Sequence, residues 1–162
     1  MIAGDAHALR PQSTRVVYWV CAGKTEVKSR PFVRAPRHCG VLPATVLMRP
    51  RGSTRFKRIT IHSKTTLELH VDFPDCWDGV HLDSPDHHSH MAYSTHFVCP
   101  RSHPVKVPLI RLAIRYPIRS GIGVELASGG QLTGHADFFN AWNQRALERL
   151  VDACFHVRPC NR

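Results

Sequence analysis

The chain has 162 residues, of which 43% are hydrophobic and 21% charged, so it is long enough to bury a core as one domain. It contains no apolar run of the roughly 18 residues that a transmembrane helix needs, which excludes a membrane-spanning helix. Its first residues, MIAGDAHALRPQ, lack the charged start and the apolar stretch of a signal peptide.

The net charge of +10 is unevenly distributed along the chain. Residues 1–64 carry 13 Lys and Arg against two acids, or +11, and residues 65–162 carry nine against ten, or −1. Residues 28–64 hold ten basic residues, no acidic residue and four prolines, which predicts a basic insert or disordered loop without regular elements. This segment could bind phosphates electrostatically, but its few aromatic residues do not favour nucleic acid as a partner.

Two segments alternate between apolar and polar residues and are predicted to be half-buried β-strands. In residues 65–73, Leu67, Leu69, Val71 and Phe73 form one face, and Thr66, Glu68, His70 and Asp72 form the other. In residues 107–116, the predicted inward side chains are Ile110, Leu112, Ile114 and Tyr116, and the predicted outward ones are Arg111 and Arg115. Shorter strands are predicted at 16–21 and 123–127.

A helix is predicted over residues 138–155, with Asp137 as its N-cap, because Phe139, Trp142, Ala146, Leu150 and Cys154 recur at helical spacing. Together these elements predict a mainly β (α+β) fold. We expect one strand-rich domain over 1–162, with a core at 65–160, long irregular loops and one C-terminal amphipathic helix.

Six cysteines are present and none forms a C-x-x-C pair, which argues against a zinc ribbon or a thioredoxin-type site. Three disulfides in an oxidising compartment would account for the even number. Pairing in chain order is the least demanding arrangement, and it joins Cys21 to Cys39, Cys76 to Cys99 and Cys154 to Cys160.

The predicted loop at residues 74–106 holds most of the residues that could carry chemistry. Seven of the 12 histidines lie between His70 and His103, interleaved with five aspartates. Carboxylates and imidazoles carry acid–base and metal chemistry near neutral pH. Long irregular loops in compact domains are usually functional or disordered, and a Cys76–Cys99 disulfide would favour function.

Four blocks of the sequence resemble signature blocks of one family: PDCWDG at 74–79, LDSPDHHSHMAY at 82–93, CPRSHPVKVP at 99–108 and TGHADFFNAW at 133–142. The opening MIAGDA is similar to a further block. On these residues the chain resembles the domain-of-unknown-function family nineteen-ninety-six, found in secreted proteins of filamentous fungi and actinobacteria, often beside sugar-binding modules. The resemblance implies an extracellular location.

The resemblance also implies that this chain is an N-terminally truncated domain, corresponding to its C-terminal two-thirds. Family members typically carry an upstream segment with two closely spaced histidines, preceded by a signal peptide, and neither is present in this chain. The stretch at 30–64 has no counterpart in the family.

Asp86, His87 and His90 form a D-H-x-x-H pattern, in which two imidazoles three residues apart could face one ion. The alternative is that these groups bond the backbone of their own loop, as Asp and Ser commonly do in turns. His88, between them, is expected to point away.

Asp75, Asp78 and Asp83 surround Trp77, and two carboxylates beside an aromatic ring are what a glycosidase needs. An Asx-turn is the simpler role for Asp75 or Asp78. His135 follows Gly134, whose predicted tight turn would aim the imidazole toward a site.

The candidate residues fall into three sets. Catalytic candidates are Asp78, Asp83, Asp86, His90 and His135. Binding candidates are Trp77, Tyr93 and His103. Candidate ligands for a divalent metal ion are His87, His90, His135 and Asp137, although capping the predicted helix is the simpler role for Asp137.

Two functions are expected from these residues and from the resemblance. The first is a secreted domain that acts on or binds extracellular carbohydrate, and the sequence leaves open whether it is an enzyme. The second is a non-catalytic, wall-associated or metal-stabilised module whose partner is a polysaccharide or cell-wall glycan. Nucleic-acid binding through 28–64 is a third hypothesis, and the sequence does not determine the oligomeric state.

Overall fold

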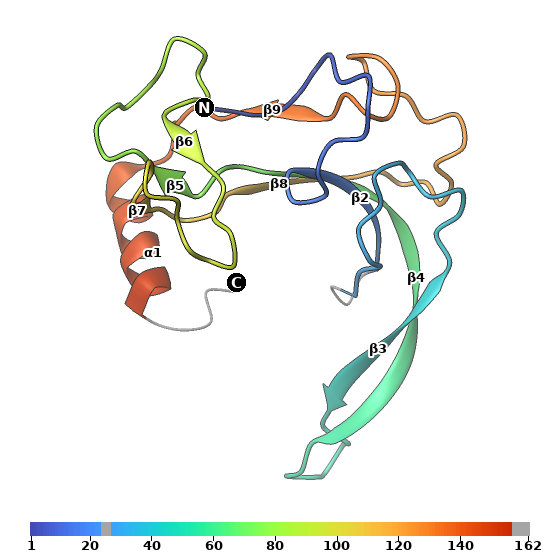
Figure 1. The fold of residues 1–162 in the computed structure, drawn as a ribbon. Helices are drawn as coiled ribbons and strands as arrows, with labels where there is room; N and C mark the ends of the chain where they lie inside the picture. The colour runs from blue at the N-terminus through green and yellow to red at the C-terminus, as the bar shows by residue number, and fades with distance from the viewer. Residues whose placement is uncertain (24–26, 157–162) are drawn as a thin grey trace. The chain divides into compact units, whose positions relative to one another are not determined.

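The structure is a computed structural model that describes residues 1–23 and 27–156, the last three by their backbone alone. The fold is mainly β, with several antiparallel sheets and one C-terminal helix, which confirms the predicted fold class (Figure 1). The chain divides into two compact units. The loop unit comprises Met1–Ile2, Pro74–Ile110 and the chain from Asp137 onward, and the sheet unit comprises Ala3–Phe73 and Arg111–Ala136.

The sheet unit is built around one long strand, β4 (Lys57–Asp72). The second half of β4 pairs with β2 (Val17–Gly23) on one side and with β8 (Arg111–Arg115) on the other. Its first half pairs only with β3 (Val41–Met48), which gives a two-stranded hairpin that extends away from β2 and β8 (Figure 1). The predicted strands at 16–21 and 65–73 are therefore confirmed.

The prediction that residues 28–64 lack regular elements is wrong for β3 and for the first half of β4. Pro43 argued against a strand because proline has no N–H for the ladder. It lies in β3, an edge strand of the sheet, and an edge strand tolerates proline because one side of its backbone needs no partner.

The second half of β4 is buried on both faces, so the prediction of a half-buried strand is wrong. Leu67, Leu69 and Val71 lie in the core on one face. On the other face Glu68 and His70 are only 3% and 0% exposed. Their burial is possible because each is paired within the sheet unit, as described below.

The strand predicted at 107–116 is shorter in the structure, where β8 spans only Arg111–Arg115. Leu112 and Ile114 lie opposite Val71 and Leu69, on the predicted side, but they remain 41% and 38% exposed. In the described sheet β8 is an edge strand, with β4 as its partner on one side only.

The strand predicted at 123–127 is not formed. This region consists of turns, and Leu126 makes only an isolated bridge to Gly130. Gly123, Gly129 and Gly130 have positive φ values, which breaks the extended backbone that a strand requires.

The loop unit contains three two-residue strands in the order β6 (Met91–Ala92), β5 (Cys76–Trp77) and β7 (Val105–Lys106). The disulfide Cys76–Cys99 ties β5 to the segment between β6 and β7. A further two-stranded sheet joins β1 (Ile2–Gly4) to β9 (His135–Asp137).

The C-terminal helix α1 (Gln144–His156) begins six residues later than predicted. Asn143 caps it, because its side-chain oxygen accepts the N–H of Ala146 at 3.0 Å. The predicted capping role of Asp137 is wrong, since Asp137 ends strand β9.

Two of the three predicted disulfides, Cys21–Cys39 and Cys76–Cys99, are confirmed. The predicted pair Cys154–Cys160 lies outside the side chains that the structure describes. Within the described part of the chain, no helix has the length and apolar character needed to cross a membrane.

Candidate functional site

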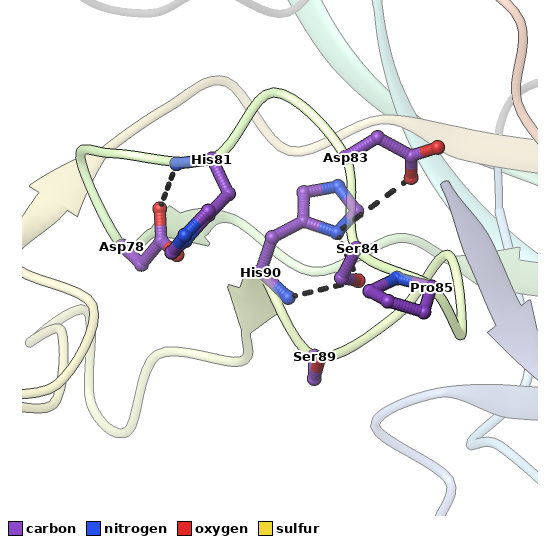
Figure 2. Close-up of a pocket in the computed structure, with 7 residues that line it drawn as sticks. All are labelled: Asp78, His81, Asp83, Ser84, Pro85, Ser89 and His90. Carbon is purple, nitrogen blue, oxygen red and sulfur yellow. Dashed lines mark hydrogen bonds and ion pairs between the residues drawn. The ribbon is translucent and has the colours of Figure 1, made fainter.

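The loop between β5 and β6 encloses an open hollow of about 290 Å³. Figure 2 shows the imidazole of His90 standing between Asp78 and His81 on one side and Asp83 and Ser84 on the other. The hollow is lined by residues of this loop alone: Asp78, His81, Asp83, Ser84, Pro85, Ser89 and His90. The sequence-predicted residues Asp78, Asp83 and His90 are thus brought together.

Asp78 organises the first turn of this loop. Its Oδ1 accepts the N–H groups of Val80 and His81 at 2.8 and 2.9 Å, and its Oδ2 accepts Nδ1–H of His81 at 2.7 Å. Gly79 has a φ of 84°, a conformation that favours glycine. Hydrogen bonds from the His81 ring and the Val80 amide hold the pKa of Asp78 well below its usual range. Asp78 therefore forms an Asx-turn and is ionised at neutral pH.

Asp86 organises the second turn. Its Oδ1 accepts the hydroxyl of Ser84 at 2.6 Å and the N–H groups of Ser89 and His88 at 2.8 and 3.0 Å. The hydrogen bonds from Ser84, Ser89 and His88 hold the pKa of Asp86 well below its usual range. Asp86 does not line the hollow, so its geometry is that of a loop brace.

Asp83 faces two imidazoles. Nδ1–H of His87 donates to Oδ2 of Asp83 at 2.7 Å, and Nδ1 of His90 lies 4.0 Å from Oδ1 (Figure 2 shows the second contact). Burial raises the pKa of Asp83, but the hydrogen bond from His87 and the nearby imidazoles outweigh burial, so the pKa is lowered. Asp83 is half exposed, at 55% of its side chain, and can accept hydrogen bonds from a ligand.

The contacts of Ser84 determine which nitrogen of His90 carries the proton. Oγ of Ser84 lies 2.6 Å from Oδ1 of Asp86, and two oxygens this close must share a proton, so the Ser84 hydroxyl donates to Asp86. Oγ of Ser84 is then an acceptor for Nδ1 of His90 at 2.8 Å, which must carry a hydrogen. The Nε2 of neutral His90 therefore bears a lone pair.

The other binding candidates lie in the same unit. Nε1–H of Trp77 donates to the carbonyl of His81 at 2.5 Å, and Nε2–H of His103 donates to the carbonyl of Ser89 at 3.0 Å. Tyr93 borders a second hollow of about 280 Å³ next to Cys99 and Pro100.

His135 and Asp137 do not flank a helix, as the sequence suggested, but lie in strand β9. Nδ1–H of His135 donates to the carbonyl of Thr133 at 3.0 Å, and its ring belongs to the sheet unit. Across the residues that the structure describes, no three His, Cys, Asp or Glu side chains gather in a way that could hold a metal ion.

Sequence reasoning missed His81 and Ser84 in the loop. None of the candidate sets above includes His81. The signal that could have found it is its position three residues after Asp78 with a glycine between, which is a spacing typical of an Asx-turn.

A second cluster of ionisable groups lies in the sheet unit, and sequence reasoning also missed it. Nε2–H of His70 donates to Glu68 at 2.9 Å, and the hydroxyl of Tyr18 donates to Nδ1 of His70 at 3.2 Å. Oε1 of Glu68 accepts Nε–H of Arg115 at 2.6 Å, and Nζ of Lys28 lies 3.7 Å from Oε2. Arg115 and Lys28 thus balance the charge of Glu68, which is only 3% exposed.

Next to this cluster, Arg111 binds Asp72 through two hydrogen bonds of 2.5 and 2.7 Å. The guanidinium of Arg111 also stacks over the ring of Tyr18, 5.6 Å from its centre. This network has the composition of an active site, but neither hollow of the loop unit is lined by its residues.

Comparison with protein families matches residues 1–142 to the family described as Domain of unknown function (DUF1996). The chain belongs to the DUF1996 family. The match covers the loop at 78–90 and the network of Glu68 and His70, and it leaves α1 outside. Comparison of this DUF1996 domain with curated proteins and with solved structures gives no match. The two disulfides among its described cysteines are consistent with a secreted or extracellular protein.

Proposed function

We propose that this DUF1996 domain binds extracellular carbohydrate in the hollow formed by residues 78–90. One observation carries the proposal: the hollow presents mainly hydrogen-bond acceptors. Asp78 and Asp83 are ionised, and an ionised carboxylate can only accept hydrogen bonds. His81 and His90 each use Nδ1–H inside the loop, so each neutral ring has its lone pair on Nε2.

An acceptor-rich, open hollow is complementary to a ligand that carries many hydroxyl donors. Sugars have this property. The disulfides support an extracellular setting, in which glycans are common polymers, and the family resemblance given above implies the same setting. The acceptors are also preorganised, since the loop's own hydrogen bonds hold Asp78 and His81 in place before any ligand arrives. An anionic ligand would be repelled by the same carboxylates.

The geometry favours binding over hydrolysis. A glycosidase needs one carboxyl group that is protonated near neutral pH and acts as a general acid. Asp78, Asp83 and Asp86 all have lowered pKa values, so none of them meets this requirement. Ser84 is unsuited to be a nucleophile because its hydroxyl donates to Asp86 rather than to an imidazole.

A divalent cation is a second ligand for the same acceptors, because carboxylates and imidazole lone pairs are metal ligands. Asp78 and Asp83 are ionised at this hollow, which favours a cation over an anion. Each binding measurement therefore includes one arm with EDTA and one with added calcium or zinc. Binding to glycan that requires the metal would move the proposal to a metal-assisted module.

The test is retention of the protein on insoluble chitin, cellulose and fungal β-glucan, with affinity measured by calorimetry on soluble oligosaccharides of the polymer that retains it. Asp83→Asn and His90→Gln each remove one acceptor, and each should weaken binding by about tenfold, or ~1.4 kcal/mol. His88→Ala is the matched control, because the ring of His88 is exposed and does not line the hollow.

Equal binding by wild type, Asp83→Asn and His90→Gln, with unchanged melting curves, would refute the proposed site. Release of reducing sugars by the wild type, lost in His90→Gln, would replace binding with catalysis. Asp83 is half exposed, so its variant should keep the fold even if His90→Gln does not.

A further inference from the structure

The β3–β4 hairpin carries a concentration of exposed basic and apolar side chains at its end, and the proposed glycan site does not explain them. We define the hairpin tip as residues 47–58. Its five basic side chains are all exposed: Arg49, Arg51, Arg55, Lys57 and Arg58. No acidic residue occurs anywhere between Lys28 and Lys64. Among the described residues, these five side chains take part in no ion pair.

Three large apolar side chains are exposed at the same tip. Leu47 is 67% exposed, Met48 is 52% exposed and Phe56 is 63% exposed. Leu47 and Met48 are neighbours on β3, and so project from opposite faces of the ribbon. The apolar surface thus surrounds the end of the hairpin instead of lying against the sheet.

The tip is an ordered structure. The N–H of Ser53 donates to the carbonyl of Pro50 at 3.0 Å, and Gly52 has a φ of 78° at the turn between them. Nε–H of Arg49 donates to the carbonyl of Ser53 at 2.6 Å. The strands behind the turn are held by eight paired positions, from Val41 opposite Lys64 to Met48 opposite Lys57.

The two faces of the hairpin differ along its length. On one face, the positions paired as Pro43–His62, Thr45–Thr60 and Leu47–Arg58 are all exposed. On the other face, Val46 and Ile59 are half-buried against each other. The contact between Val46 and Ile59 therefore stabilises the hairpin, while the side chains at its tip remain exposed.

From these observations we infer that the hairpin tip docks on an anionic lipid surface. A soluble polyanion would account for the five basic side chains but not for Leu47, Met48 and Phe56, whose exposure to water is unfavourable. A bilayer with anionic headgroups satisfies both sets at once. Arg and Lys bind the headgroup phosphates, and the apolar side chains enter the boundary between headgroups and acyl chains.

The tip is complementary in charge to an anionic membrane, because it carries basic side chains and the surrounding residues 28–64 contain no acid. Each basic side chain near such a membrane raises the affinity by about fivefold. The hairpin extends away from β2 and β8, so its tip is presented without obstruction from the other strands of the sheet unit (Figure 1). This docking is independent of the glycan site, because it uses none of the residues at 78–90.

The test is flotation of the full chain with vesicles of phosphatidylcholine alone and vesicles that also contain phosphatidylglycerol. We expect binding only to the anionic vesicles. Arg51→Glu/Arg55→Glu should weaken it by about 25-fold or more, taking about fivefold for each charge. Leu47→Ser/Phe56→Ser removes apolar surface but no charge, and it should also weaken binding by at least about tenfold.

The matched control is Arg10→Glu/Arg101→Glu, which changes the net charge by the same amount at two exposed positions outside the tip. It should bind as the wild type does. If this control lost as much vesicle binding as Arg51→Glu/Arg55→Glu, net charge alone would explain the binding, and the inference would be overturned. Full binding by Leu47→Ser/Phe56→Ser, together with competition by soluble dextran sulfate or DNA, would assign the tip to a soluble polyanion instead. No binding to anionic vesicles would also overturn it.

Discussion

Acidification should destabilise the sheet unit through a single side chain, His70. This imidazole is 0% exposed, accepts the hydroxyl of Tyr18 and donates Nε2–H to Glu68. Burial lowers the pKa of His70 below 6.5; the hydrogen bond to Glu68 opposes this, and the charges of Lys28 and Arg111 add to it. The folded state therefore keeps His70 neutral at a pH where the unfolded chain has already bound a proton.

Proton linkage gives the direction and the size of this change in the free energy of unfolding. Because the folded pKa is below the unfolded one, the contribution of His70 is fully present above about pH 6.5 and is lost as the pH falls toward the folded pKa. The loss approaches about 1.4 kcal/mol per pH unit, so at about pH 5.5 it amounts to at most ~1.4 kcal/mol. Glu68 also has a lowered pKa, but its contribution is lost only below about 4.5, outside this window.

The assay is urea unfolding of the wild type and two variants at about pH 7 and about pH 5.5. His70→Gln retains a donor toward Glu68 but does not titrate, so the difference in unfolding free energy between the two pH values should shrink by up to ~1.4 kcal/mol. Tyr18→Phe removes one hydrogen bond to neutral His70, costs about 1 kcal/mol at about pH 7 and should reduce the pH dependence less than His70→Gln does. If His70→Gln shows the same pH dependence as the wild type, the reasoning about His70 is wrong.

Two further predictions concern the loop unit. Replacing Cys76 and Cys99 with serine opens a loop that spans 23 residues, and it should lower the free energy of unfolding by about 3.4 kcal/mol in urea titrations; a loss below about 1 kcal/mol would contradict the structural role of the disulfide. His96 and Phe97 have φ values of 51° and 65° at a two-residue hairpin turn, where Asn-Gly is the preferred pair. His96→Asn/Phe97→Gly should therefore raise the melting temperature, with a gain of about 0.5–2 kcal/mol, and a lowered melting temperature would show that the turn is not strained.

The strands that alternation predicts are the ones that the structure shows most clearly. Leu67, Leu69 and Val71 occupy one face of β4 as the sequence pattern indicates. Periodicity identifies which side chains share a face, but it cannot tell how much of each face is covered. Glu68 and His70 share the predicted polar face and are nevertheless buried, because Arg115 and Tyr18 from neighbouring strands pair with them.

The pairing across β4 and β8 could have been inferred from charge. The sequence places Glu68 and Asp72 on the polar face of one predicted strand and Arg111 and Arg115 on the polar face of another. An antiparallel pairing in which Glu68 lies opposite Arg115 also places Asp72 opposite Arg111, as observed. What the sequence lacks is the information that these two strands are neighbours, since 38 residues separate Asp72 from Arg111.

The errors in the remaining elements have local causes. The hairpin of β3 and β4 was obscured by Pro43 and Pro50, although the first lies in an edge strand and the second in the turn. The helix was extended too far toward its N-terminus, because Phe139 and Trp142 match the helical spacing. Asn143 supplies the cap that Asp137 was expected to supply, and residues before a cap do not join the helix.

The sequence located the loop but overstated how many of its residues are available to a ligand. A histidine- and aspartate-rich segment must satisfy its own backbone first, and Oδ1 of Asp86 is occupied in doing so, by backbone and hydroxyl donors. Among the residues that line the hollow, the acceptors presented to a ligand are the carboxylates of Asp78 and Asp83 and the Nε2 atoms of the neutral rings of His81 and His90. Because these atoms accept hydrogen bonds and do not supply an acidic proton, we propose that the loop holds a polyhydroxylated ligand rather than cleaving one.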